Sequence, residues 1–377
     1  MVFRQATRAR VTAIFAAYAA AACGGSSADR ASASDASVAP FDAGADGGNA
    51  VSDADAPAGD ASVSHIDSEP AEKVRGCVLM PQDSFPHADV RTLPIHPRSA
   101  EWMSFLGTRK VTVAATLDSS QSPPVRYGQG FNLADTTTPL SQASHYGGYS
   151  KKNFYFGQFP LPSPLVIQTF FDRHALVVET DGCVSYEFIG FEFFAGLPRA
   201  LGAVRWDLKA YGYQPDYYGI NVVGWPLVST LLRADELRAG RIDHALSFVI
   251  PDGRKANATT DPPLWPAKRS DGPSTDPSAV PLGAWLRLRN DFDLTAFSPA
   301  ARTIAEALKR HGMLLGDTGG TTSALMVNIE KSEDWTDANG ARLEPQLNAI
   351  RGLLTAANFE VIDTAPMRVN DESFQIK

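Results

Sequence analysis

The sequence predicts an α+β fold: a mainly antiparallel β-sandwich or jelly-roll-like body with two late helices packed on it. Short runs rich in β-branched and aromatic residues fill the middle of the chain, and turn residues separate them. Helix signals occur only towards the C-terminus. Because short strands joined by frequent turns pair with their neighbours, we expect mostly antiparallel sheets.

The predicted strands are short and are bounded by turns such as Asp181-Gly182 and Pro251-Asp252-Gly253. In the middle of the chain they are Leu165 to Phe171, Ala175 to Glu179, Cys183 to Phe194, Ala203 to Leu208, Ile242 to Ile250 and Trp285 to Leu288. Around the late helices they are Met313 to Leu315, Ser323 to Val327 and Phe359 to Ile362.

Two helices are predicted near the C-terminus. Ser298 is a good capping residue, Pro299 suits the first helical position, and Gly312 ends the apolar periodicity that follows. The second helix is predicted over Glu344 to Ala357. Strands give way to helices near residue 290, which marks a candidate boundary between two sub-domains of residues 73–377.

Residues 1–22 have the features of a secretory signal peptide. Arginines precede an apolar run that is too short to span a bilayer stably, and small residues follow it. Cys23 after this run resembles the lipidation site of a bacterial lipoprotein, although Ala20 stands where that pattern usually has leucine. We therefore expect an exported protein, lipid-anchored at Cys23 to the bacterial envelope, at the outer membrane or the cell surface.

Residues 23–72 consist almost entirely of Ala, Asp, Ser and Gly, and Phe41 is their only aromatic residue. Such a composition predicts a disordered tether, because too little apolar surface is available to offset chain entropy. The acidic residues of this segment far outnumber its single arginine, Arg30. The tether therefore accounts for the net charge of −8 of the whole chain. Residues 73–377 are close to neutral, which excludes a basic nucleic-acid-binding face. The expected membrane contact is through the lipid anchor only.

Cys77 and Cys183 are the two cysteines that remain after Cys23. In an oxidising compartment an even pair predicts a disulfide, and two buried free thiols are the alternative. No Cys/His spacing matches a zinc site, and no phosphate loop or dinucleotide fingerprint is present. No metal and no cofactor are therefore expected.

An aromatic loop is the first candidate for ligand binding. Tyr211, Tyr213, Tyr217 and Tyr218 lie in a Gly/Pro-rich segment, and Trp225 follows. Exposed rings with a hydroxyl at the tip suit the apolar faces of sugars. The alternative is a loop whose rings fold back onto the sheet.

Three acids form the candidate catalytic set. Alternation along its predicted strand places Glu187 on an apolar face, where burial would raise the pKa as a general acid requires. Asp172 precedes a strand and Asp207 ends another. Glycoside hydrolysis needs two such carboxyls at a fixed separation. The alternative is that Glu187 pairs with Arg205 or Arg287 and that Asp172 only closes a turn.

Two histidines and a further acid complete the candidate site. His244 alternates with apolar residues, so it is either a core residue or a catalytic one, and His174 is a candidate for substrate binding. Asp317-Thr318-Gly319 spells the aspartic-protease tripeptide but has no second copy in the chain. A strand-end turn and a pocket shared by Asp317 with the other acids are the other interpretations.

From about residue 80 to its end the chain resembles a group of largely uncharacterised secreted bacterial proteins. The matching segments are Asp172 to Val178, Cys183 to Glu187, Trp206 to Leu208, Arg241 to Phe248 and His311 to Gly319. The resemblance implies action on polysaccharides, because some members of the group sit beside sugar-binding modules. Arg269 stands where the group tends to have histidine, and Thr318 where it tends to have asparagine. The departure at Thr318 argues against the aspartic-protease interpretation. The missing histidine leaves open whether this copy is active.

The sequence thus favours a surface-tethered carbohydrate-active protein, a polysaccharide hydrolase with paired carboxylates, whose partner is a polysaccharide or oligosaccharide. The alternative is a non-catalytic lipoprotein that binds glycans or another envelope component. Two carboxylates facing one open site would distinguish the hydrolase from the binding protein.

Overall fold

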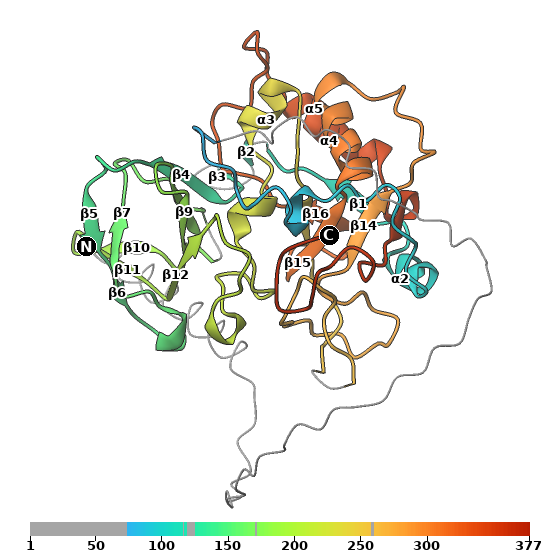
Figure 1. Cartoon of the computed structure of the whole chain (residues 1–377). Helices are drawn as coiled ribbons and strands as arrows, with labels where there is room; N and C mark the ends of the chain where they lie inside the picture. Colours follow the sequence, from blue (N-terminus) through green and yellow to red (C-terminus); the bar gives the residue numbers. More distant parts are fainter. Residues whose placement is uncertain (1–73, 116, 119–124, 170–171, 258–259) are drawn as a thin grey trace, which may run out of the picture. The chain divides into compact units, whose positions relative to one another are not determined.

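A six-stranded mixed sheet lies at the centre of the structure, a computed structural model that describes residues 74–115, 117–118, 125–169, 172–257 and 260–377 (Figure 1). Its strands run in the order β1-β16-β13-β15-β14-β17. β13 and β15 are parallel, as are β1 and β16, and the other neighbours are antiparallel. The strands are β1 (Lys110–Thr112), β13 (Leu246–Ile250), β14 (Trp285–Leu288), β15 (Met313–Thr318), β16 (Ala324–Val327) and β17 (Phe359–Val361).

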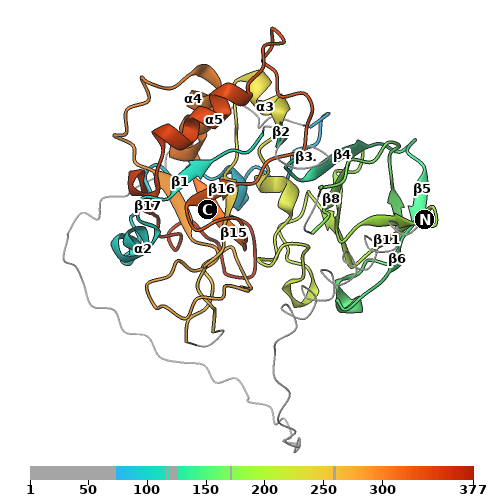
Figure 2. The same ribbon diagram turned by 180° about the vertical axis from the view of Figure 1, so that it is seen from behind.

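The helices α4 (Pro299–Arg310) and α5 (Glu344–Leu353) pack on this sheet and on each other, as Figures 1 and 2 show. Their amphipathic patterns bury residues such as Ile304 and Leu347, because the apolar stripe of each helix faces the core. Ser298 precedes α4, but its hydroxyl makes no capping hydrogen bond. Instead the Gln346 side chain of α5 accepts a hydrogen bond from the Ala300 amide at 3.1 Å, so α5 caps α4.

A four-stranded sheet in the order β12-β9-β8-β4 is the second large element. Its strands are β4 (Gly130–Ala134), β8 (Ala175–Glu179), β9 (Val184–Ile189) and β12 (Gly202–Asp207). Alternating residues face two different cores: Leu176 and Trp206 join the main core, whereas Val177 and Phe188 pack into a smaller aromatic one. Both faces of this sheet are therefore buried.

Short elements surround the two sheets. The remaining strands are β2 (Leu117–Asp118), β3 (Val125–Arg126), β5 (Leu140–Gln142), β6 (Ser144–His145), β7 (Gln158–Pro160), β10 (Glu192–Phe194) and β11 (Leu197–Ala200). The other helices are α2 (Ser99–Leu106) and α3 (Ala234–Ala239), with 3₁₀ turns η1 (Phe85–His87), η2 (Lys151–Asn153), η3 (Pro215–Tyr217), η4 (Leu227–Thr230) and η5 (Ala356–Asn358).

The predicted α+β class is confirmed, as are both late helices, whereas a sandwich or jelly-roll is not confirmed. One predicted strand is wrong, because residues 165–169 form no strand. The strand predicted from Cys183 to Phe194 breaks at Gly190, whose positive φ of 65° ends β9. β13 begins only at Leu246, so the strand predicted from Ile242 starts four residues late. α2, α3 and the strands before residue 165 were not predicted.

The described residues from Val74 to Lys377 belong to one structural unit. Strands from both sides of residue 290 share the six-stranded sheet, so the sheet continues across the candidate sub-domain boundary. The predicted signal, Cys23 and the tether lie outside the described residues.

The predicted disulfide between Cys77 and Cys183 is present, with its Cα atoms 5.3 Å apart. Cys77 is fully buried, and Cys183 lies in the turn between β8 and β9. The bond therefore fastens the segment before α2 to the four-stranded sheet.

Replacing both Cys77 and Cys183 by serine is expected to lower the free energy of unfolding by roughly 4–5 kcal/mol, since the bond links residues 106 positions apart. Urea unfolding of the variant and the wild type measures the difference. Thiol titration of the unfolded, unreduced mature protein is the control, and two reactive thiols there would contradict the disulfide.

Candidate active site

Asp317 lies at the carboxyl end of β15, where a β-bulge determines the direction of its side chain. Phe248 of β13 pairs with Leu315, but the next residue, Val249, pairs with Asp317, so Gly316 is the extra residue. Without the bulge Asp317 would take the place opposite Ile250, on the face of the buried Phe248. The bulge turns it to the other face, in line with the general use of bulges to redirect a side chain.

Gly316 is suited to the bulge because its surroundings leave little room for a side chain. A Cβ atom there would lie 3.3 Å from both the Ser247 Cβ and the Trp225 Cζ2. Trp225 is fully buried. The absence of a side chain at Gly316 therefore lets the indole pack directly beneath the bulge.

Two further acids approach Asp317 from other parts of the chain. Asp271 comes from the loop between β13 and β14, and its Oδ1 accepts a hydrogen bond from the Thr318 hydroxyl at 3.0 Å. Asp172 precedes β8, and its backbone carbonyl accepts a hydrogen bond from the Gly190 amide at 2.6 Å. We call Asp172, Asp271 and Asp317 the acidic cluster.

The charges of the acidic cluster act on one another. Burial, followed by repulsion from Asp271 and Asp172, raises the pKa of Asp317 well above its usual value. Amide donors from Thr318, at 2.8 Å, and Val222 oppose this shift without cancelling it. Burial also raises the pKa of Asp271, against its hydrogen bond from Thr318, and Asp172 adds to the rise. Asp317 is therefore the acid that holds a proton most strongly.

The acidic cluster remains accessible to solvent. Asp317 is half-buried, and Asp172 and Asp271 are exposed as whole residues, although the Asp271 carboxyl is partly desolvated. Arg269 lies near Asp271 and opposes the rise in its pKa, and its guanidinium also lies 5.0 Å from the Tyr218 ring centroid. A protonated carboxyl beside exposed carboxylates can donate a proton while a neighbour acts as base or nucleophile.

His174 lies buried beside the acidic cluster. Its Nδ1 lies 2.7 Å from the Gln129 Oε1. Burial lowers the pKa of His174, and the charge of Asp172 partly offsets this effect. The ring is therefore buried next to Asp172 and is not exposed to a ligand.

Glu187 is the predicted general acid, and the structure places it in the core. Its side chain is fully buried, and its carboxyl accepts hydrogen bonds from the Leu227 and Val228 amides, both at 3.1 Å. Burial raises the pKa of Glu187 to about 7, as expected for an apolar face. Neither Arg205 nor Arg287 pairs with it in the described residues. Glu187 holds η4 against β9 and is out of reach of a polysaccharide.

Asp207 is not close to the other predicted acids. In the β9–β12 register it pairs with Val184, whereas Glu187 pairs with Val204, so their side chains point to opposite faces. Gly202 begins β12 at the end of the sheet near Gly190 and Asp172. Asp207 ends the strand five residues later, roughly 16 Å away along the strand. The expected pairing of Asp207 with Glu187 or Asp172 is therefore not formed.

Most tyrosines of the predicted sugar platform make hydrogen bonds within the protein. Tyr211 donates a hydrogen bond to Asp83 at 2.5 Å, Tyr217 to Glu372 at 2.7 Å, and Tyr213 to the Pro266 carbonyl at 2.7 Å. These bonds fold the loop back onto three other segments, at Asp83, Pro266 and Glu372, and Trp225 is buried. Two members of the predicted platform lie close to the site: Trp225 packs beneath Gly316, and Tyr218 contacts Arg269.

Exposed aromatic rings lie elsewhere. Phe193 and Phe194 of β10 are 52% and 60% exposed, although phenylalanines in strands are expected in the core, and Phe156 before β7 is 57% exposed. The Arg199 guanidinium lies 3.9 Å from the Phe194 ring centroid. The hairpin of β10 and β11 therefore presents its apolar side chains to solvent.

His244 precedes β13 and is buried. Its Nε2 lies 2.6 Å from a Glu236 oxygen, and its Nδ1 lies 2.9 Å from the Ala245 carbonyl. Arg233, 2.9 Å from the same Glu236 oxygen, completes a buried charged group at α3. This arrangement gives His244 a structural role rather than the catalytic one considered for it.

Sequence reasoning named Asp172, His174 and Asp317 but missed Asp271 and Arg269 as site residues. Asp271 lies in an irregular Gly/Pro-rich loop without periodicity, so no pattern in the sequence linked it to Asp317. Its proximity depends on the path of the loop between β13 and β14.

Comparisons of the chain with known protein families, curated proteins and solved structures find no match. Among the described residues, no three His, Cys, Asp or Glu side chains are grouped so as to hold a metal ion. No helix in the described ranges is long and apolar enough to cross a bilayer.

Replacing Asp317 by asparagine is expected to raise the melting temperature at pH 7. The folded protein keeps a proton on Asp317 at pH values where the unfolded chain has released it, so Asp317 reduces stability as the pH rises above about 4. The difference between variant and wild type should shrink below that pH, where both states are protonated.

Carboxyl NMR titration gives the direct check on Asp317. In the wild type the resonance assigned to Asp317 should titrate well above the normal aspartate range, and Asp271→Asn should lower the pKa of Asp317 by removing a like charge. An Asp317 with an ordinary pKa would contradict the electrostatics of the acidic cluster.

Proposed function

We propose that the protein is a surface-tethered polysaccharide hydrolase whose catalytic carboxyls are the acidic cluster. The observation that carries this proposal is the meeting of three acids from separate segments. The bulge in β15 directs Asp317, the Thr318 hydroxyl binds Asp271 at 3.0 Å, and repulsion from Asp271 and Asp172 adds to the effect of burial in raising the pKa of Asp317. Glycoside hydrolysis needs a carboxyl that stays protonated and a second that is ionised. Their partly exposed positions give a substrate access to both.

In this proposal Asp317 protonates the oxygen of the leaving sugar. Asp172, the exposed carboxylate from the other sheet, acts as base or nucleophile. Asp271 is a positioning residue, since its hydrogen bond with Thr318 and its charge keep the proton on Asp317. Arg269 occupies the position of the histidine expected from the resemblance and contributes a cation at the rim of the site.

Asp317→Asn and Asp172→Asn are each expected to lower the release of reducing ends from a susceptible polysaccharide by about two orders of magnitude or more. The wild-type rate should fall at high pH as Asp317 loses its proton. A panel of polysaccharides assayed for released reducing ends identifies the substrate.

Asp207→Asn is the matched control, because Asp207 is an exposed aspartate at the far end of β12. It should retain wild-type turnover. Binding of a polysaccharide without any turnover would instead support the non-catalytic glycan-binding lipoprotein, and cleavage of a protein substrate would support the aspartic-protease interpretation of Asp317-Thr318-Gly319.

The proposed location is the bacterial envelope, reached by export and lipidation of Cys23. The pattern of residues 1–24 and the disulfide of Cys77 with Cys183 both support it, since disulfides persist in oxidising compartments.

Cys23→Ala is expected to release the protein from membranes. Cell fractionation of the variant should move it into the soluble envelope fraction, whereas Ser26→Ala, a neighbouring control, should stay with the membranes. A Cys23→Ala protein that fractionates like the wild type would contradict lipid anchoring.

A further inference from the structure

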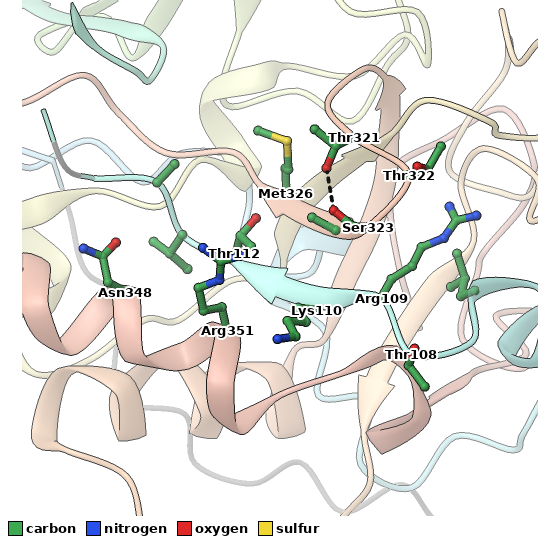
Figure 3. Close-up of a pocket in the computed structure, with 14 residues that line it drawn as sticks. Thr108, Arg109, Lys110, Thr112, Thr321, Thr322, Ser323, Met326, Asn348 and Arg351 are labelled. Atoms are coloured by element: carbon green, nitrogen blue, oxygen red, sulfur yellow. Dashed lines mark hydrogen bonds between the residues drawn. The ribbon is translucent and has the colours of Figure 1, made fainter. Parts of the chain in front are cut away.

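A cavity of about 770 Å³ lies at one end of the six-stranded sheet, and no residue of the acidic cluster lines it (Figure 3). Its walls come from the start of β1, the turn before β16, and the last turns of α5. The volume falls in the range of small-molecule sites. The polar residues that line it are Thr108, Arg109, Lys110, Thr112, Thr321, Thr322, Ser323, Asn348 and Arg351.

The charge of this cavity is of one sign. Arg109, Lys110 and Arg351 line it, and no carboxylate does. Arg109 is held by Asp252 in a bidentate ion pair, with distances of 2.6 and 2.7 Å. Lys110 and Arg351 are exposed and have no ion-pair partner in the described part of the chain. Two uncompensated cations therefore face the same cavity.

The remaining polar side chains are neutral hydrogen-bonding groups. Hydroxyls of Thr112, Thr321, Thr322 and Ser323 line the same cavity as the cations, and the Asn348 amide adds both a donor and an acceptor. The Thr321 and Ser323 hydroxyls lie 3.1 Å apart and hydrogen-bond to each other. Such a lining suits a ligand that carries many hydroxyls as well as negative charge.

The strand directions place this cavity at the same end of the strands as Asp317. β13 and β15 terminate at this end, whereas β16 and β1, antiparallel to β13, begin there. Residues 319–323 connect Asp317 and Thr318 to the cavity wall at Thr321. A chain-like ligand bound at one place is thus held near the other.

We propose that this cavity is a binding site for an anionic oligosaccharide segment bearing carboxylate or sulfate groups, with Lys110 and Arg351 pairing with the anions. Charge-assisted hydrogen bonds to carboxylate or sulfate are the strong contacts that these cations offer. The inference goes beyond the proposed hydrolysis, because binding here requires no turnover at the acidic cluster.

The test is isothermal titration calorimetry on the full-length Asp317→Asn protein, which removes turnover. The ligands are an oligogalacturonate, a sulfated dextran oligosaccharide, an uncharged dextran oligosaccharide of equal length, and inorganic sulfate. At least one of the two anionic saccharides should bind, and which one does identifies the group recognised. The uncharged saccharide and inorganic sulfate should bind at least about tenfold more weakly.

Lys110→Gln combined with Arg351→Gln should weaken binding of the anionic saccharide by about tenfold for each cation removed. Raised salt should weaken binding of the same saccharide by the parent protein to a similar extent. Arg205→Gln with Lys209→Gln is the matched control, since both are exposed on or just after β12 and unpaired in the described residues. Melting curves establish that each variant folds.

Equal affinity for charged and uncharged saccharides, or an equal loss in the Arg205/Lys209 control, would overturn the proposal. Binding of inorganic sulfate alone would overturn the saccharide assignment. Loss of hydrolysis in Asp317→Asn concerns only the acidic cluster, so the two proposals fail separately.

Discussion

The parallel pairing of β13 with β15 is the constraint on which the rest of the structure depends. These strands lie at the centre of the six-stranded sheet, and their apolar residues form the middle of the main core. Because parallel strands need a long crossover, the chain between them is free to supply β14, α4 and the loop that carries Asp271. The same pairing contains the bulge at Gly316 that directs Asp317. Core formation and placement of the site therefore result from one strand pair.

Buried acids give the protein a stability that depends on pH. Burial raises the pKa values of Glu187 and Glu330 to about 7, so both stay protonated in the folded state at mildly acidic pH. The contribution of these two protonated acids to the free energy of unfolding is complete below about pH 4.5 and is lost as the pH rises towards 7. Glu236 behaves in the opposite way: burial favours its protonation, but Arg233 and His244 overcome this and lower its pKa. The protein thus buries some acids as neutral groups and others as ion pairs.

Predictability differed between elements for physical reasons. β14 was predicted with its exact limits because Trp285 to Leu288 is a short apolar run between turn residues, and α4 because Pro299 and Gly312 mark its ends. The strand from Leu165 failed because an apolar run alone does not show whether a partner strand is available. Glu187 was correctly placed on an apolar face with a raised pKa, yet full burial makes it a structural residue.

The sequence by itself determined the local properties of the chain: the α+β class, the late helices, the cysteine pair and the acidic, low-complexity N-terminal segment. The class and the helices depend on periodicity and capping residues that lie within a few positions of one another, and the cysteine pair and the N-terminal segment depend on composition. Only the tertiary structure decided which acids meet. Asp172, Asp271 and Asp317 come from three separate segments, and their mutual effect on pKa depends on distances that no local pattern encodes. The cations Lys110 and Arg351 share a cavity for the same reason, because sheet pairing and helix packing bring β1 beside α5.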